Sequence, residues 1–465
     1  MKRRSFAFLC ILIMITLLTG CGQKLFTDSS SASPVVLPEP EGKTVQVGAG
    51  DMRTAYSRRV ILYYAGQDGS LSSELRLIHV YSDDNLAELV TRALFVKPYY
   101  SSGLTSVIPD GAELLACEVS GDIAVLDFSR DILSAGEEAL SVMRSAVTST
   151  LLGLDGIKCV DILTEGMALE LAGLPAGAET RVDLDAPAVY LQHMSEKMRI
   201  ENGNGTVERT ALLYVPTDGS GLVVPEKRAV RLSGGDALEI LMDAYSARCL
   251  LPGSAVSSVS YLDEDGSRIA EVSLTDVEDA ESFVPSITMS VCGFVPNIDY
   301  VCVVSDGDVV TKAAGLISEK GLWKYTDFRY LTGRPVQLYV GGKDASLRRL
   351  DTVLSGRTVS VRDILNELFA ADVFPGTASA ADILGIRIED QTAYINISPA
   401  LYSLCQELSA EEEKILVYSI VNSVCANIDT VDSVGILVSD ERVETLAGNI
   451  SLISPLMPNP GLVAG

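Results

Sequence analysis

Residues 114–129 read LLACEVSGDIAVLDFS, and this stretch indicates the type of fold. Two largely apolar runs flank Ser120-Gly121-Asp122, a pattern typical of two antiparallel strands joined by a tight turn. The second run ends in Leu126-Asp127-Phe128-Ser129, where apolar and polar side chains alternate, as in a strand covered on one face. We expect this hairpin to be the centre of a small α/β unit.

The flanking residues complete that unit, from about residue 59 to residue 171. Strand-like runs at residues 60–64 and 75–80 come first, and residues 156–163 form a closing strand. Two helices are expected, the first capped by Asp83 or Asp84 and the second opened by a capping box at Ser134-Ala135-Gly136-Glu137. Their inward faces carry Leu86, Leu89, Val90, Ala93 and Leu94 in the first, and Leu140, Met143, Val147 and Leu151 in the second.

The same order of elements recurs twice, and such internal repetition is the most informative feature of the chain. In the last copy, residues 334–445, Ser360 is the expected first cap and Ser409-Ala410-Glu411-Glu412 the expected capping box. The middle copy, residues 208–310, is more divergent, and Pro285 should lie in the first turn of its second helix. The comparison aligns the strand ends Leu126–Ser129, Ala270–Ser273 and Ile395–Ser398.

The fold class is therefore α+β, with three tandem two-layer α/β sandwich domains of order β-α-β-β-α-β, in which the helices cover one face of a small mixed sheet. The expected boundaries are a signal peptide at 1–20, a flexible tether at 21–55, domains at 56–172, 205–312 and 333–447, and a tail at 448–465. Trp323, in the second linker, should bury against a neighbouring domain.

The N-terminus reads as a lipoprotein signal. Lys2, Arg3 and Arg4 precede an apolar run at residues 8–18, which is shorter than the span of about 20 residues that a membrane helix needs. The run ends in Leu18-Thr19-Gly20-Cys21, which predicts acylation of Cys21 and cleavage before it; an ordinary signal with an incidental cysteine is the alternative. The Ser-, Pro- and acid-rich residues that follow predict the tether.

Composition limits the partners. The chain has 465 residues and a net charge of −26, so nucleic acid and anionic headgroups are unsuitable ligands. The seven cysteines after Cys21 lie in apolar stretches and read mostly as buried core residues, although Cys292 with Cys302 is the first disulfide to test. With His79 and His193 as the only histidines, a multi-His metal site is excluded.

No catalytic motif is present, so we expect no enzyme activity, no cofactor and no metal. The sequence DGSG at 218–221 lacks the spacing of a nucleophile elbow and reads as a turn. The acids at 263–265 and 432 do not follow a Ca²⁺ loop, and Glu411-Glu412-Glu413 suits the first turn of a helix. His193 reads as a linker packing residue.

The stretch GLTSVIPDG at 103–111, followed by VLDFS at 125–129 and GIKCV at 156–160, resembles the GerMN domains of sporulation and germination lipoproteins. The middle copy keeps only Leu251-Pro252-Gly253 of this pattern, and the last keeps only Phe374-Pro375-Gly376-Thr377. The resemblance implies a fold similar to the ring-building motif and a role supporting an envelope channel complex. The chain departs from the family pattern, because it has three domains whereas the family's sporulation protein has two.

We therefore expect a scaffold or assembly lipoprotein, anchored through Cys21 on the extracytoplasmic side of the cell membrane. Its expected partners are membrane lipid, proteins of a sporulation or germination complex, and a second copy of the chain. The alternatives are an anchored binding module for a wall fragment or small solute, and an accessory lipoprotein of a sensor system. A flat apolar surface between domains would favour the scaffold, and a deep polar cleft would favour the binding module.

Overall fold

The computed structural model describes residues 45–66, 70–81, 84–99, 103–171, 173–180, 205–217, 219–233, 236–342 and 345–464. The expected signal peptide, the lipidation residue Cys21 and His193 lie outside these ranges. Residues 47–465 form one compact unit. The described part is a mixed α/β protein with small sheets and eight α-helices, which agrees with the expected fold class.

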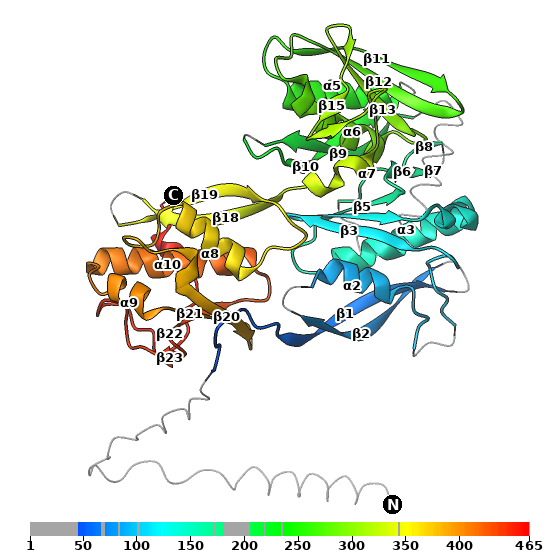
Figure 1. Cartoon of the computed structure of the whole chain (residues 1–465). Helices are drawn as coiled ribbons and strands as arrows, with labels where there is room; N and C mark the ends of the chain where they lie inside the picture. Colours follow the sequence, from blue (N-terminus) through cyan, green and yellow to red (C-terminus); the bar gives the residue numbers. More distant parts are fainter. Residues whose placement is uncertain are drawn as a thin grey trace, which may run out of the picture. The chain divides into compact units, whose positions relative to one another are not determined.

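The three copies follow one another along the colour gradient of Figure 1, and each has two strands, a helix, two strands, one helix (two in the third copy) and a closing strand. The first repeat comprises β1 (Ala55–Ala65), β2 (Leu71–Tyr81), α2 (Leu86–Ala93), β3 (Leu114–Ser120), β4 (Ile123–Phe128), α3 (Gly136–Leu152), β5 (Cys159–Thr164) and a short β6 (Met167–Ala168).

The second repeat comprises β9 (Val207–Pro216), β10 (Val223–Leu232), α5 (Ala237–Cys249), β11 (Ala255–Glu264), β12 (Ser267–Thr275), α6 (Ala280–Phe294), β13 (Tyr300–Ser305) and β14 (Asp308–Val309). The third comprises β18 (Arg334–Gly341), β19 (Leu347–Leu354), α8 (Val361–Ala370), β20 (Ile383–Glu389), β21 (Thr392–Ile397), α9 (Pro399–Cys405), α10 (Ala410–Asn427), β22 (Ser433–Val438) and β23 (Glu441–Arg442). Between them run the short pairs β7 (Glu170–Leu171) with β8 (Leu174–Pro175) and β15 (Lys312–Ala313) with β16 (Leu316–Ile317), then β17 (Leu322–Trp323) and α7 (Tyr325–Phe328).

The main sheet has the same topology in each repeat. The central strand pairs antiparallel with its hairpin partner and parallel with the closing strand, so the orders are β3-β4-β5-β6, β11-β12-β13-β14 and β20-β21-β22-β23. The parallel pairing follows because a helix connects the two strands and returns the chain to the same edge. The first strand of each hairpin is an edge strand with a β-bulge.

The expected two-layer sandwich is wrong in one respect, because each opening hairpin forms a separate two-stranded sheet. In the first repeat, Figure 1 shows α2 and α3 between the β1–β2 hairpin and the main sheet, which makes three layers. The burial of α3 agrees with this, since eleven of its seventeen residues are buried, a number too large for a helix covered on one face only.

A hydroxyl group of the second helix binds the opening strand in every repeat. The backbone N–H groups of three tyrosines donate to these hydroxyls: Tyr63 to Thr150 at 3.0 Å, Tyr214 to Ser290 at 2.9 Å and Tyr339 to Ser423 at 2.8 Å. A two-stranded sheet leaves every second N–H of each strand without a strand partner, and burial makes such a group costly. The small polar residues of these helices therefore satisfy the hairpin backbone.

Several helix ends differ from the prediction. Asn85, not an aspartate, caps α2, and its side chain accepts from the backbone N–H of Glu88. The expected box at Ser134 is wrong because a 3₁₀ turn precedes α3, and Ser134 donates instead to the carbonyl of Asp131. Pro285 lies inside α6, beyond its first turn. The cap at Ser360 and the capping box at Ser409 are confirmed, and Ser360 also forms a capping box with Asp363.

The alignment of the middle copy was wrong by two residues. Parallel pairing with the closing strand makes Phe128, Leu274 and Ile397 equivalent, since each is the last residue of its strand to pair. The residues before them, Asp127, Ser273 and Asn396, therefore occupy one position, and Glu271 does not. A strand pattern repeats every two residues, so a shift of two preserves the alternation and escapes detection from the sequence.

The residues before β1 form an extended segment that lies against the third repeat, and we call residues 47–54 the strap. The backbone N–H groups of Gly50 and Met52 donate to the carbonyls of Leu384 and Ile386 in β20, at 2.7 and 2.8 Å. The expected tether extended to residue 55, whereas the structure places these residues on the edge of a sheet.

Trp323 is buried in the core of the second repeat. Its side chain is 2% exposed and packs on Phe328, with the ring centroids 5.3 Å apart. This confirms the burial expected for Trp323. All seven described cysteines are free thiols, and five of them are buried, as the core interpretation predicts. Cys292 on α6 and Cys302 on β13 form no disulfide.

Candidate functional site: a cleft at Asp127

The turn after the closing strand positions a polar site at the end of each main sheet. Glu165, Asp306 and Ser439 begin these turns with φ near 50°, and their N–H groups donate to the carbonyls of Phe128, Leu274 and Ile397. The next N–H points back across the sheet: Gly166 donates to Asp127 Oδ1 at 2.8 Å, and Asp440 donates to Asn396 Oδ1 at 2.9 Å. The second residue of each turn also has a positive φ, which favours Gly or Asp there.

Asp127 is 2% exposed and shares a face of β4 with Ile123 and Val125, which pack into the core of the second repeat rather than against the helices of the first. Its Oδ2 atom is 3.5 Å from Nη1 of Arg329, which follows α7 in the linker to the third repeat. Burial raises the pKa of Asp127 to about 6, although the Gly166 N–H and the Arg329 charge act in the opposite direction. The carboxyl group therefore exchanges its proton close to neutral pH.

A cleft of about 470 Å³ opens at Asp127. Its walls come from the first repeat, the second repeat and the linker around α7, and they consist of Leu115, Asp127, Arg130, Glu165, Gly166, Met167, Cys292, Ile298, Asp299, Lys324, Tyr325, Thr326 and Arg329. Only glycine at position 166 allows the turn to pack this closely against Tyr325, because a Cβ there would lie 2.9 Å from Cβ of Tyr325. Binding sites for small molecules commonly have volumes of this size.

The lining carries three cationic and three acidic side chains. Two of the ion pairs within it are long: Arg329 with Asp127 at 3.5 Å, and Arg130 with Glu165 at 3.6 Å. Charge-assisted hydrogen bonds are usually about 2.7–2.9 Å long, so the charged groups of both pairs lie near one another without forming a short hydrogen bond. Lys324 Nζ lies 4.6 Å from the centroid of the Tyr300 ring, at the same opening.

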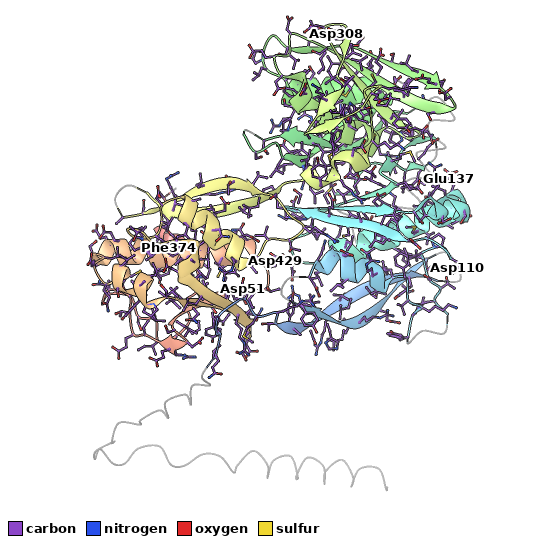
Figure 2. The ribbon with its side chains drawn as sticks, in the orientation of Figure 1. Asp51, Asp110, Glu137, Asp308, Phe374 and Asp429 are labelled. Atoms are coloured by element: carbon purple, nitrogen blue, oxygen red, sulfur yellow. The ribbon has the colours of Figure 1, made fainter. Side chains whose placement is uncertain are left out.

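The strap occupies the equivalent position in the third repeat. Asn396 Nδ2 donates to the carbonyl of Gly48 at 3.2 Å, and Asp440 Oδ1 accepts the N–H groups of Val47 and Gly48. A Cβ on Gly385 would lie 2.6 Å from the carbonyl oxygens of Gly48 and Gly50, so only glycine allows this approach. Asp51 adds an ion pair of 2.6 Å with Arg362, and Figure 2 labels it beside this repeat.

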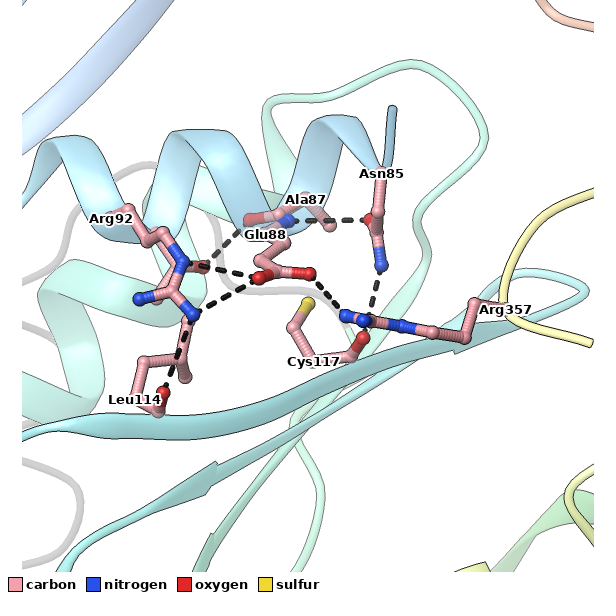
Figure 3. A network of polar contacts seen from close by, with 8 residues as sticks. Asn85, Ala87, Glu88, Arg92, Leu114, Cys117 and Arg357 are labelled. Carbon is pink, nitrogen blue, oxygen red and sulfur yellow. Dashed lines mark hydrogen bonds and ion pairs between the residues drawn. The ribbon is translucent and has the colours of Figure 1, made fainter. Parts of the chain in front are cut away.

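The first and third repeats also touch at Glu88 on α2, as Figure 3 shows. One carboxylate oxygen of Glu88 binds Arg92 of the same helix at 3.0 Å, and the other binds Arg357 of the third repeat at 2.6 Å. Asn85, the helix cap, donates through Nδ2 to the carbonyl of Cys117 at 3.0 Å, so α2 is held to β3 as well. Glu88 is thus a fixed acceptor for a cation from another repeat.

The acidic clusters noted in the sequence have different structural roles. Glu412 completes the helix cap of α10, as expected from its position. Glu413 has another role, which the sequence did not show: its buried carboxylate accepts four backbone N–H groups of residues 446–450. The acids at 263–265 form a hairpin turn in which Glu264 pairs with Lys320 at 3.2 Å.

Sequence reasoning missed the Asp127 cleft, although it quoted Asp127 as part of a strand. The signal was an acid among apolar residues in a strand that is buried throughout. Within the described ranges, no group of three or more His, Cys, Asp or Glu side chains is placed to hold a metal ion. No helix in the same ranges is long and apolar enough to cross a membrane.

Comparisons with known proteins gave matches to solved structures and to one family model. Tandem GerMN domains of the sporulation protein GerM from Bacillus subtilis are 16% identical over 57% of this chain and 95% of theirs, with a TM-score of 0.22. The first GerMN domain of that protein alone is 19% identical over 27% of this chain and 95% of its own, with a TM-score of 0.21.

A Clostridium perfringens protein provisionally described as a lipoprotein is 15% identical over 27% of this chain and 88% of its own, with a TM-score of 0.20. The comparison with curated proteins gave no significant match. The model of the Germane family, described as sporulation and spore germination, matches residues 61–170 and 337–444, which lie in the first and third repeats. The first and third repeats therefore match the Germane family.

Proposed function

We propose that this chain is an extracytoplasmic assembly protein of the cell envelope, anchored through acylated Cys21 and acting in sporulation or germination. Its repeats would serve as contact units for other proteins of the complex. The family match supports the process, and the signal-like N-terminus supports the anchor. A second copy of the chain is one candidate partner.

An exposed apolar patch on the first repeat carries the contact part of this proposal. Ile61 and Leu75 are cross-strand partners on the outer face of the β1–β2 hairpin, and Leu77 is two residues further along β2 on the same face. Their side chains are 49%, 60% and 56% exposed, so we call these three residues the hairpin patch. Clustered exposed apolar residues are typical of protein–protein contact sites, whereas single ones are common everywhere.

Segments of this same chain already form hydrogen bonds to strands of two of its sheets. The strap pairs with the edge strand β20, and Ser120 at the end of β3 donates to the carbonyl of Gly333 at 2.5 Å. An extended segment therefore adds to the edge of the third repeat's sheet, whereas the contact at the first repeat is a single side-chain hydrogen bond. The same mode of recognition, in which a segment adds to a sheet edge, is widely used between proteins.

Light scattering of the chain from residue 45 onward, alone and mixed with envelope-complex proteins of the same cell, tests the proposal. A concentration-dependent oligomer or a stable mixed complex is expected. The double substitution Leu75→Ser with Leu77→Ser should abolish it, and Leu251→Ser, at an exposed loop leucine outside the patch, should not. A monomer that binds none of these proteins would refute the assembly role.

The anchor needs a separate test. Metabolic labelling with a palmitate analogue should mark the wild-type chain and leave Cys21→Ala unmarked and released from the membrane. An unlabelled wild-type chain would refute lipidation. The alternative functions, an anchored binding module and an accessory lipoprotein of a sensor, would require a ligand, and the polar cleft at Asp127 is the structural feature in their favour.

A further inference from the structure

We propose that the cleft at Asp127 binds a small zwitterion, a free amino acid or short peptide, by its carboxylate, its ammonium group and its apolar side chain. This inference is independent of the assembly role, because the cleft does not include the hairpin patch. It rests on the arrangement of charges, on an apolar wall, and on the length of the ion pairs inside the cleft.

The cationic side of the cleft can hold a carboxylate. Arg130 and Arg329 come from different elements, one from the turn after β4 and one from the linker after α7, and both line the same space with Lys324. In a chain with a net charge of −26, a lining with three cations against three acids is much less acidic than the chain as a whole. Guanidinium groups match a carboxylate in two parallel hydrogen bonds, which gives direction as well as strength.

The acidic side can hold an ammonium group. Glu165 and Asp299 reach the cleft from the first and second repeats, and Asp299 is oriented by the backbone N–H of Arg268, which donates to Oδ2 at 2.9 Å. With Asp127 on the floor, the acids balance the cations three to three. A ligand with charge of one sign only would leave the opposite set of lining groups without a partner on binding.

An apolar wall completes the site. Leu115, Met167 and Ile298 line the same space, and Leu115 is 42% exposed. A volume of about 470 Å³ accommodates a dipeptide with an aliphatic side chain and excludes large ligands. The ion pairs of Arg329 and Arg130 inside the cleft, at 3.5 and 3.6 Å, are longer than optimal. A ligand carboxylate can therefore replace the acidic partner of either arginine with little loss of free energy.

Ligand-observed NMR and titration calorimetry of the full chain with the dipeptide Ala-Leu test this inference, with the N-acetylated and C-amidated dipeptides as matched probes. We expect Ala-Leu to bind with a Kd at or below about 1 mM, and each blocked form to bind at least about tenfold more weakly. Arg329→Gln and the more exposed Arg130→Gln should each weaken Ala-Leu by a similar factor. Arg231→Gln, at a surface arginine 78% exposed in its side chain, is the matched control and should bind as wild type.

Three results would overturn the inference: no binding of Ala-Leu at about 10 mM, equal binding of the blocked dipeptides, or undiminished binding to both Arg130→Gln and Arg329→Gln. Trp323 fluorescence reports whether each variant keeps the fold of the second repeat, since this residue is buried in that core. Light scattering of the same samples separates the two proposals, because cleft variants should assemble as wild type does.

Discussion

Replacement of Glu413 by Gln tests how the C-terminal residues are held to the third repeat. Glu413 is fully buried in the first turn of α10. Its Oε1 atom accepts the N–H groups of Leu446 and Ala447 at 2.9 and 2.7 Å, and its Oε2 atom accepts those of Asn449 and Ile450 at 2.8 and 3.3 Å. Burial by itself raises the pKa of Glu413, but these donors together lower it below its ordinary value.

The substitution keeps the size of the side chain and changes only its hydrogen bonding. The glutamine oxygen can retain two of the four donors, while its NH₂ group faces the other two and cannot accept from them. The loss of two charge-assisted bonds, at about 1.5–3 kcal/mol each, predicts destabilisation of the third repeat by about 3–6 kcal/mol. That range approaches the total stability of a typical domain, about 5–15 kcal/mol.

Hydrogen exchange followed by mass spectrometry is the appropriate assay, because three repeats need not unfold in one transition. Peptides covering 410–452 should lose protection in Glu413→Gln, whereas urea unfolding monitored at Trp323 in the second repeat should change little. Glu411→Gln, at an exposed neighbour in the same turn, is the control and should exchange as wild type does. Unchanged protection of residues 446–450 in Glu413→Gln would refute the role given to the carboxylate.

Four further predictions follow from the contacts described above. The stability that Glu413 contributes should be present above pH 4.5 and be lost as the pH falls through its lower folded-state pKa, so wild type and Glu413→Gln should converge in acid-unfolding curves. Because burial raises the pKa of Asp127 to about 6, its contribution to stability is present below pH 3.8 and lost as the pH rises through 6. Asp127→Asn should therefore raise the free energy of unfolding at pH 7.5, measured by urea titration, by up to about 3 kcal/mol and flatten its pH profile between 4 and 7. Ser290→Ala leaves the Tyr214 N–H without its acceptor and should cost about 1–3 kcal/mol by Trp323-monitored unfolding; a loss below about 0.5 kcal/mol would contradict the role of the hydroxyl. Gly385→Ala should release the strap and abolish protection of the Gly50 and Met52 amides, while Gly103→Ala, where a Cβ meets nothing within 4 Å, should leave them protected.

The order of elements could be predicted because turns and helix caps in each repeat are marked by short-range sequence signals. The hairpin 114–128 has its turn at Gly121, and the helix caps at Ser360 and Ser409 have their acids three residues later. Such signals involve residues close in the sequence, so they do not depend on tertiary contacts.

The third layer and the cleft could not be predicted in the same way. The helix α3 carries Ser141, Ser145 and Ser149 among apolar residues, which reads as a polar face exposed to solvent, yet all three are buried. Asp127 meets Arg329 from 202 residues away, and no periodicity in the sequence connects them. Side-chain pairs at such a separation in sequence depend on how whole repeats pack together.

The strap also determines the path by which a mechanical load would enter the molecule. Because residues 47–52 are bonded to β20, Asp440 and Arg362, a pull applied from the N-terminal side reaches the third repeat before it reaches β1. The hairpin of the first repeat, with its exposed patch, stays unloaded until those bonds give way. A chain attached at its N-terminus would thus transmit tension to the repeat that is most distant in sequence and shield the one that is nearest.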